Sequence, residues 1–373
     1  MQTLVQTLKR KPTTITITIK TSSISTSIDP SFTIYFLINS CGLSRSAAIA
    51  ASSKLHLKTT KTPHSVLSLL RSYNFSKSHI SSLVSRRPKL LLSSPSSTLK
   101  PKLDFFLSLG ISDLPSLLSS SPSLLLWSLP NRMLPNLNLL QSLLGSRSAA
   151  AAAINKSRSL LTADLRKLLL PKVDTLQQNN VPMPVILKLI SMHPRCLLES
   201  PTSFSNSITT LKSFGINPQS PIFAHALGVF DKLPERVWQR KLETYRSLGW
   251  SKEDVFAAFA KHPYCMSVSD EKITAHVEFL EGKLGWERSY LMANPVVISL
   301  SLEKRIVPRC AVLALLVSNK VVKLKNGVRA RHLMMGQQWF LDKFVSRFES
   351  DVPGVVDAIQ GKVEFTGFRE IQN

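Results

Sequence analysis

Acidic residues are scarce in this sequence. Its 373 residues include 23 Asp and Glu against 47 Lys and Arg, which gives a formal net charge of +24 and a pI near 10.2. The deficit is uneven, because residues 1–200 contain six acids beside 24 basic residues. A field of that sign and size attracts polyanions. The composition therefore favours a nucleic-acid partner over a basic surface that is merely solvated.

Cysteine is also rare, and its four copies lie far apart, at Cys41, Cys196, Cys265 and Cys310. No pair has metal-site spacing, and the eight histidines form no His-x-x-x-His pair and no cluster with cysteine. We expect free buried thiols in a reducing compartment, with no metal and no cofactor. Long apolar runs are missing too, because the segment at 311–317 is too short to span a membrane. No membrane partner is predicted.

Catalytic motifs are absent. The sequence has no Gly-rich phosphate loop, no paired-acid motif and no nucleophile elbow, and EGKLGW at 281–286 is interpreted as a helix end. The chain is therefore predicted not to be an enzyme. The five tryptophans are expected to lie in the core rather than to stack on bases: Trp127, Trp238, Trp250, Trp286 and Trp339.

What the sequence does contain is a repeat. The first clear copy, RRPKLLLSSPSSTLKPKLDFFLSLG, runs from Arg86 to Gly110. Its copies are anchored at residues 88, 122, 158, 194, 227, 263 and 295, which are 34, 36, 36, 33, 36 and 32 residues apart. Five anchors are proline, whereas Arg158 and Leu227 replace it, so those two turns are expected to differ in geometry. A drifting period near 34 in an apolar chain predicts a stacked array of helical hairpins.

One repeat reads as helix, glycine cap, second helix and proline break. Leu99, Leu103, Phe106 and Leu107 follow helical spacing, and Gly110 stands where the chain must turn left-handed. Asn74 and Asn180 fill the same slot in other copies; asparagine is the next best residue there. Ser251 with Asp254 forms an N-cap with an acid three residues on. Pro263 then ends that second helix.

Residues 1–28 contain no acid and are rich in Ser and Thr, with Lys9, Arg10, Lys11 and Lys20 among them. This composition is typical of an organellar transit peptide, and the alternative is a disordered basic tail. Because arginine is sparse and hydroxyl residues abound, the composition alone leans towards a plastid.

The rest of the chain divides into four predicted parts. Residues 29–85 form N-terminal helical repeats, 86–325 the main array, 326–363 a C-terminal capping region and 364–373 a tail. The five-alanine run at 149–153 is interpreted as a short surface insertion, helical if ordered. The segment from Trp339 to Lys362 is predicted to be an amphipathic helix that caps the array.

Several segments resemble the plant branch of the mitochondrial transcription termination factor (mTERF) family. They are YFLINSCGLS at 35–44, RRPKLLL at 86–92, KHPYCMSVSDEKI at 261–273, SLEKRIVPR at 301–309 and FLDKFVSRFESDVP at 340–353. The resemblance covers roughly residues 32 to 363. It implies an all-α solenoid of about seven to eight repeats, each of two α-helices and a short 3₁₀ turn, that form a curved superhelix.

The resemblance also implies a function, namely binding of double-stranded DNA along a basic groove to regulate or terminate transcription in an organelle. It favours the mitochondrion, with the chloroplast as the alternative. An organellar RNA-binding factor in intron splicing or ribosome assembly is a second hypothesis, and a protein-binding α-solenoid scaffold is a third. We expect a monomer.

Phosphate contacts are expected from basic residues near the repeat anchors, because residues at one repeat offset line one edge of a solenoid. The ten candidates are Arg86, Arg87, Lys89, Lys100, Lys102, Arg195, Lys261, Lys304, Arg305 and Arg309.

Overall fold

The structure is a computed structural model that describes residues 30–368. Every regular element in that range is a helix or a helical turn, and no strand occurs there. The fold is an all-α helical-repeat solenoid, as predicted. The predicted transit peptide, residues 1–28, lies outside the described range, as does the end of the predicted tail.

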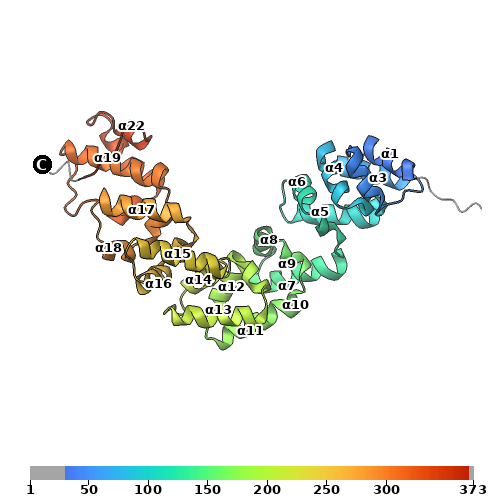
Figure 1. The fold of residues 1–373 in the computed structure, drawn as a ribbon, viewed down its shortest axis with the longest axis horizontal. Helices are drawn as coiled ribbons and strands as arrows, with labels where there is room; N and C mark the ends of the chain where they lie inside the picture. Colours follow the sequence, from blue (N-terminus) through green and yellow to red (C-terminus); the bar gives the residue numbers. More distant parts are fainter. Residues whose placement is uncertain (1–29, 369–373) are drawn as a thin grey trace, which may run out of the picture. The chain divides into compact units, whose positions relative to one another are not determined.

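The described chain forms two compact units, each built from paired helices. The first comprises residues up to 105 together with 112–126, and the second comprises 106–111 and everything from 127 onward. In the first unit the blue and cyan helices pack in chain order (Figure 1), with α2, α4 and α6 in one layer. Its elements are α1 (Pro30–Asn39), α2 (Arg45–Ser52), α3 (Lys61–Ser72), α4 (Lys77–Arg86), η1 (Pro88–Leu92), η2 (Pro95–Leu99), the start of α5 (Lys100–Ser108), α6 (Leu114–Ser120) and η3 (Pro122–Leu126).

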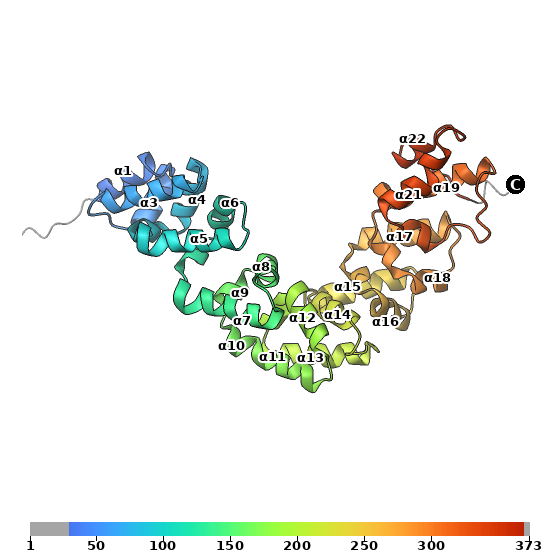
Figure 2. The ribbon, with the colours of Figure 1, turned by 180° about the vertical axis from the view of Figure 1, so that it is seen from behind.

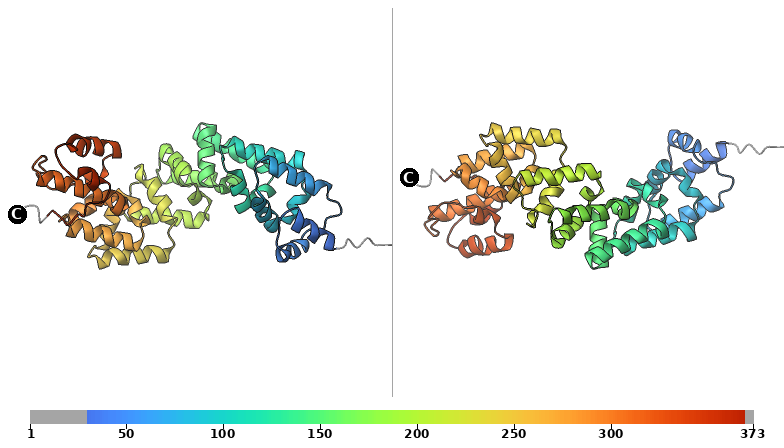
Figure 3. Two further views of the ribbon diagram at one scale, coloured as in Figure 1. Left: turned by 90° about the horizontal axis from the view of Figure 1, so that it is seen from above. Right: turned by 90° about the horizontal axis from the view of Figure 1, so that it is seen from below.

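The second unit continues the same plan, and its helices follow one another in chain order from every side (Figures 2 and 3). The second helices of successive repeats pack on each other as α8, α12, α14, α16 and α18. Its elements up to the last array turn are η4 (Leu129–Met133), α7 (Leu134–Leu144), α8 (Arg147–Lys156), α9 (Ser159–Thr162), α10 (Leu165–Leu168), α11 (Leu170–Gln178), α12 (Met183–Met192), η5 (Pro194–Leu198), α13 (Pro201–Ser213), α14 (Ile222–Phe230), α15 (Glu235–Ser247), α16 (Lys252–Lys261), η6 (Pro263–Ser267), α17 (Asp270–Gly282), α18 (Arg288–Ala293) and η7 (Pro295–Ser299).

The C-terminal elements complete the second unit. They are η8 (Leu302–Ile306), α19 (Val307–Ser318), α20 (Ala330–Met334), α21 (Gln337–Phe344), η9 (Ser346–Phe348) and α22 (Val355–Ile359). The single amphipathic helix predicted from Trp339 to Lys362 is wrong, because α21 ends at Phe344 and the chain turns through Pro353 and Gly354 before α22. Proline cannot continue the backbone ladder, and Gly354 takes a φ of 86°.

The predicted turn and cap residues of the repeat are confirmed. Gly110 has a φ of 76°, and Asn74 and Asn180 take 65° and 61° in the equivalent slot. Each of the five anchor prolines begins a 3₁₀ turn, at η1, η3, η5, η6 and η7. The capping box at Ser251 and Asp254 is also present.

A second periodic signal lies six residues after the anchors. The side chain there caps the N-terminus of the next helix or helical turn by accepting a hydrogen bond from the backbone N–H three residues on, which satisfies a donor that the helix itself cannot. The six capping residues are Ser94, Ser128, Asp164, Ser200, Ser269 and Ser301. Serine at this repeat position therefore serves to begin the next helix.

The two anchors without proline behave differently. At Arg158 a short α-helix, α9, replaces the 3₁₀ turn, whereas Leu227 lies inside the continuous helix α14. The alanine run at 149–153 is helical, as expected for an ordered run, but the predicted surface insertion is wrong, because these residues belong to the packed helix α8. Ala150, Ala153 and Ile154 are fully buried there, so α8 is the second helix of its repeat. Alanine lets this helix approach its neighbours closely, and its weak side-chain signal concealed the periodicity.

Successive repeats are joined by buried polar side chains, which we call the clamp residues. They lie fourteen residues after the anchor, or thirteen for His276, in the first helix of the repeat. Each donates to one or more backbone carbonyl oxygens 23 to 27 residues on, at the end of the following turn or, for Arg309, at the end of α20. The clamp residues are Lys102, Asn136, Lys172, Lys241, His276 and Arg309.

The geometry of the clamps is specific. Asn136 Nδ2 donates to Leu160 O at 2.9 Å and to Ala163 O at 2.8 Å. Lys172 Nζ donates to Leu197 O at 2.9 Å and to Glu199 O, and it lies 5.3 Å from the centre of the Phe204 ring. Burial lowers the pKa of Lys172, which is the cost of placing a charge there. The carbonyl oxygens offset that cost, because they would otherwise be unpaired at the end of a turn.

The exception supports this account. The repeat anchored at Pro194 carries apolar Ile208 at the clamp position, and its neighbour is the Leu227 repeat. There the turn is absent, and the continuous helix α14 satisfies its own carbonyls. The side-chain donor of one repeat and the unpaired carbonyl oxygens of the next are therefore absent from the same place in the array.

The Lys172→Met variant should be destabilised by about 1–3 kcal/mol, because it keeps the side-chain volume and leaves the two carbonyl oxygens without a donor. Chemical denaturation followed by circular dichroism measures this change. Lys167→Met, at an exposed position nearby, is the matched control and should change stability by less than about 0.5 kcal/mol. Equal effects of the two substitutions would contradict the clamp.

Candidate nucleic-acid interface

Three of the ten candidate residues are engaged inside the protein. Lys102 is a clamp residue whose ammonium donates to Leu125 O, and burial lowers its pKa. Arg309 is 1% exposed and donates to the carbonyl oxygens of His332, Leu333 and Met335. In this structure neither side chain presents its charge to solvent.

Arg305 joins Arg309 on the same carbonyl group. Its Nε donates to Leu333 O at 2.9 Å, and its Nη2 donates to Met334 O and Met335 O. Burial and the neighbouring Arg305 lower the pKa of Arg309 to about 10, so the Arg309 guanidinium stays charged at neutral pH. The two arginines therefore close the C-terminal end of α20, where a helix exposes unpaired carbonyls.

Lys100 is exposed but paired. Its Nζ lies 2.7 Å from Asp104 Oδ2, and Tyr73 donates to the other oxygen of that carboxylate at 2.5 Å. Such a surface pair between residues i and i+4 contributes only a few tenths of a kcal/mol, so a phosphate can compete for Lys100.

The other six candidates are exposed. Arg86, Arg87 and Lys89 surround the η1 turn in the first unit, and Arg195, Lys261 and Lys304 lie at or near η5, η6 and η8 in the second. Arg86 and Lys261 occupy the same repeat position, the last residue of the second helix. Lys156, which sequence reasoning missed, occupies it in α8.

Two of these helix-terminal cations make the same local contact. Arg86 Nη1 donates to Ser120 O at 2.7 Å, and Lys156 Nζ donates to Ser191 O at 3.0 Å. Both acceptors lie in the last turn of the next repeat's second helix, where the helix dipole favours a cation. The side chains remain exposed, so each keeps further N–H donors for another acceptor.

Most of the basic side chains have no acidic partner. Within residues 30–368, ion pairs involve only the cations Lys100, Arg132, Arg240, Lys241, Arg246, Arg288 and Lys362. The positive charge of the described chain is therefore not neutralised internally, and it acts on the solvent around the turns.

Sequence reasoning also missed a histidine and tyrosine track across three repeats. His193 Nε2 and His225 Nδ1 are 3.2 Å apart, and Tyr264 Oη lies 2.9 Å from His225 Nδ1 and 3.3 Å from His193 Nε2. Continuing the track, His262 Nε2 is 2.8 Å from Ser299 Oγ. The sequence did hold a signal, because His193 and His262 both directly precede an anchor proline.

The track is electrically neutral at pH 7. Burial, assisted by the positive charge of Lys232, lowers the pKa of His193 to about 4, and burial also lowers the pKa of His225 and of His262. His193 is packed so closely that a Cβ on Gly228 would lie 2.1 Å from its ring. The track thus places a tightly packed uncharged group of side chains within the second unit.

Other chemistry finds little support in the described residues. No group of three or more His, Cys, Asp or Glu side chains among them is placed to hold a metal ion. Within the same range, no helix has the length and hydropathy that crossing a membrane requires. All four cysteines are free and buried, as predicted, and burial raises the pKa of Cys41 to about 12. Trp238, Trp250 and Trp286 lie in the core, but Trp127 and Trp339 are exposed, so the prediction failed for these two.

Comparison with known proteins fits this repeat architecture. The sequence model of the mTERF family matches residues 67–220 and 115–341, which together cover most of the chain. The chain belongs to the mTERF family. An Arabidopsis thaliana protein named "Transcription termination factor MTERF8, chloroplastic" is 25% identical to this mTERF chain over 227 residues. The match covers 60% of this chain and 45% of the length of that protein.

The stability of this mTERF protein should fall as the pH drops from 7 to 5. A histidine in the unfolded chain has a pKa near 6.5, whereas His193 in the folded protein has a pKa of about 4. Between these two pH values the unfolded state therefore binds a proton at this residue that the folded state does not bind. Stability is therefore complete above pH 6.5 and is lost towards pH 4, with about 2 kcal/mol lost at pH 5 from His193 alone.

Urea denaturation between pH 5 and pH 7.5 tests this expectation. His193→Gln should reduce the stability lost between pH 7 and pH 5 by about 2 kcal/mol, whereas His56→Gln, at an exposed position, should leave that loss unchanged. The same loss of stability in His193→Gln and in the wild type would refute the assignment.

Proposed function

We propose that this mTERF protein binds double-stranded DNA in an organelle and regulates or terminates transcription by remaining bound. The proposal rests on exposed basic side chains that recur at the helix ends and turns of the repeats and form no ion pair with an acidic residue among those described. They are Arg86, Arg87, Lys89, Lys156, Arg195, Lys261 and Lys304. Cations that recur from repeat to repeat within a unit suit a polymer with a periodic charge.

Family membership and the name of the Arabidopsis relative support the link to transcription. The proposed activity is binding alone, without catalysis. Phosphate contacts carry no sequence information, so these residues supply affinity and position rather than base selection. Lys102, Arg305 and Arg309 are left out of this interface because their charges are used between repeats.

Equilibrium binding of residues 29–373 to labelled duplex DNA, single-stranded RNA and structured RNA of matched length, across a salt series, tests the proposal. Duplex DNA should bind most tightly, and log K should fall linearly with log salt. The Arg195→Gln, Lys261→Gln double variant should reduce that slope by about 1 to 2, because each lost phosphate contact removes roughly 0.9.

Lys362→Gln is the control for this experiment, because Lys362 is paired with Asp357 at 3.1 Å and should leave the slope unchanged. Tighter binding to RNA would move the proposal to RNA processing. No binding to any of the three probes at low salt would favour a protein-binding scaffold.

We further propose that residues 1–28 direct the chain to an organelle. Fusion of these residues to a fluorescent protein should give import into mitochondria or plastids in plant cells. Mitochondrial import would agree with the resemblance noted in the sequence, and plastid import with the hydroxyl-rich composition and the name of the relative. Diffuse cytosolic fluorescence would contradict the proposal.

A further inference from the structure

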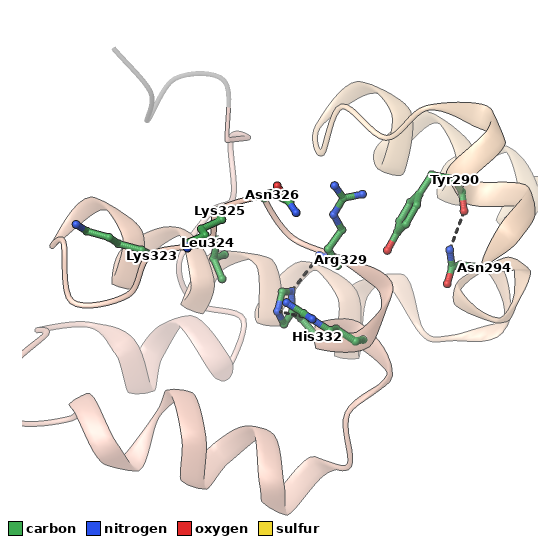
Figure 4. Close-up of a pocket in the computed structure, with 10 residues that line it drawn as sticks. Tyr290, Asn294, Lys323, Leu324, Lys325, Asn326, Arg329 and His332 are labelled. Atoms are coloured by element: carbon green, nitrogen blue, oxygen red, sulfur yellow. Dashed lines mark hydrogen bonds between the residues drawn. The ribbon is translucent and has the colours of Figure 1, made fainter.

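A basic pocket lies near the C-terminal end of the second unit (Figure 4). Its volume is about 620 Å³, and its wall is formed by the segment between α19 and α20 together with α18. Four cations line it, namely Lys323, Lys325, Arg329 and Arg331, and none of its lining residues is acidic. Tyr290 and Asn294 of α18 form the opposite side.

The wall of the pocket is held in place by hydrogen bonds from the neighbouring repeat. Trp286 Nε1 donates to Val328 O at 2.8 Å, and the N–H of Ala330 donates to Tyr290 Oη at 3.0 Å. Gly327 turns the segment with a φ of 67°, and its N–H donates to Leu324 O. The cations therefore project from a fixed backbone, so a ligand need not order a loose loop in order to bind.

The four cations are not neutralised. No ion pair in the described part of the chain involves any of them, and no acid occurs in the sequence between Glu303 and Asp342. The Arg329 guanidinium stacks on the Tyr290 ring with its carbon 4.9 Å from the ring centre. Stacking occupies the face of a guanidinium and leaves its N–H edge free to donate.

One of these cations, Arg331, already acts on a neighbouring group. His332, which also lines the pocket, has its pKa lowered to about 4, by burial first and then by the charges of Arg331 and Lys343. Like charges gathered around one concave site repel each other, and an anion bound among them would relieve that repulsion.

We propose that this pocket binds the phosphate group of a nucleotide, with Lys325 and the two arginines on the phosphate oxygens and the sugar and base in the remaining volume. A volume of about 620 Å³ lies within the range of small-ligand sites and exceeds what a phosphate alone requires. Arginine donates to phosphate oxygens in a forked geometry, and lysine acts as a point charge. The planar Arg329 and Tyr290 stack offers a surface for a base.

This inference deepens the proposed function, since the nucleotide is either the phosphorylated end of a bound strand or a free nucleotide. The two sources share the phosphate monoester, whose charge of nearly −2 is matched better by four cations than an internal diester is.

Calorimetric titration of residues 29–373 at low salt tests the pocket with four probes. They are adenosine 5′-monophosphate, adenosine, and a short DNA oligonucleotide with either a 5′-phosphate or a 5′-hydroxyl. Adenosine 5′-monophosphate should bind at least about tenfold more tightly than adenosine, because charge-assisted hydrogen bonds to phosphate supply the difference.

Lys325→Gln with Arg331→Gln should weaken binding of the monophosphate by about tenfold or more. Both side chains are exposed, so the thermal midpoint of this double variant should match that of the wild type. Lys320→Gln, at an exposed lysine of the same segment that does not line the pocket, should change nothing.

The oligonucleotide arms separate the two sources. A preference for the 5′-phosphate that the double variant abolishes identifies a strand end, whereas equal binding of both oligonucleotides beside tight binding of the monophosphate identifies a free nucleotide. Equal affinity for adenosine and its monophosphate, or a double variant that binds as the wild type does, overturns the proposal. If the protein binds the monophosphate but not duplex DNA, nucleotide binding in the pocket stands and the proposed function is refuted. If it binds duplex DNA but not the monophosphate, only nucleotide binding in the pocket is refuted.

Discussion

The array depends on one interaction, a buried donor in one repeat that satisfies the carbonyl oxygens at the end of the next repeat's turn. Apolar packing alone holds helices together but tolerates sliding, because dispersion contacts have little direction. A hydrogen bond between a fixed side chain and a fixed carbonyl does have direction. Lys102, Asn136, Lys172, Lys241, His276 and Arg309 therefore set the position of each hairpin against its neighbour. Because the buried clamp residues fix the spacing between hairpins, surface cations at equivalent repeat positions can recur with that spacing.

Much of the fold could be predicted from the sequence because its punctuation is local. A proline that breaks a helix and a glycine or asparagine that turns left-handed act within a few residues, and Pro88, Gly110 and Asn180 behave as expected. The alanine run in α8 and the broken helix after Phe344 were mispredicted for the same reason. In both segments tertiary packing and a turn outweighed a weak or misleading periodicity.

The candidate site was less predictable, because a basic residue in the sequence does not reveal whether its side chain points into the protein or to solvent. Lys102 and Lys100 are two residues apart on one helix, yet one is buried under a carbonyl and the other is exposed beside Asp104. Arg309 was chosen for its position near an anchor, and the same position makes it a clamp residue. The basic pocket escaped prediction since its cations lie on a segment outside the repeat, and Tyr290 and Asn294 reach it only through the fold.

The clamps all point the same way along the chain, from each repeat to the one that follows. Apart from the repeats anchored at Pro194 and Leu227, an interior repeat both offers carbonyl oxygens and supplies a donor, so it can be duplicated or exchanged without leaving either one unmatched. The last donor has no such freedom. Arg309 finds its acceptors in α20, which belongs to no repeat. The C-terminal segment is therefore required by the module that it closes, because it holds the only acceptors that Arg309 has among the described residues.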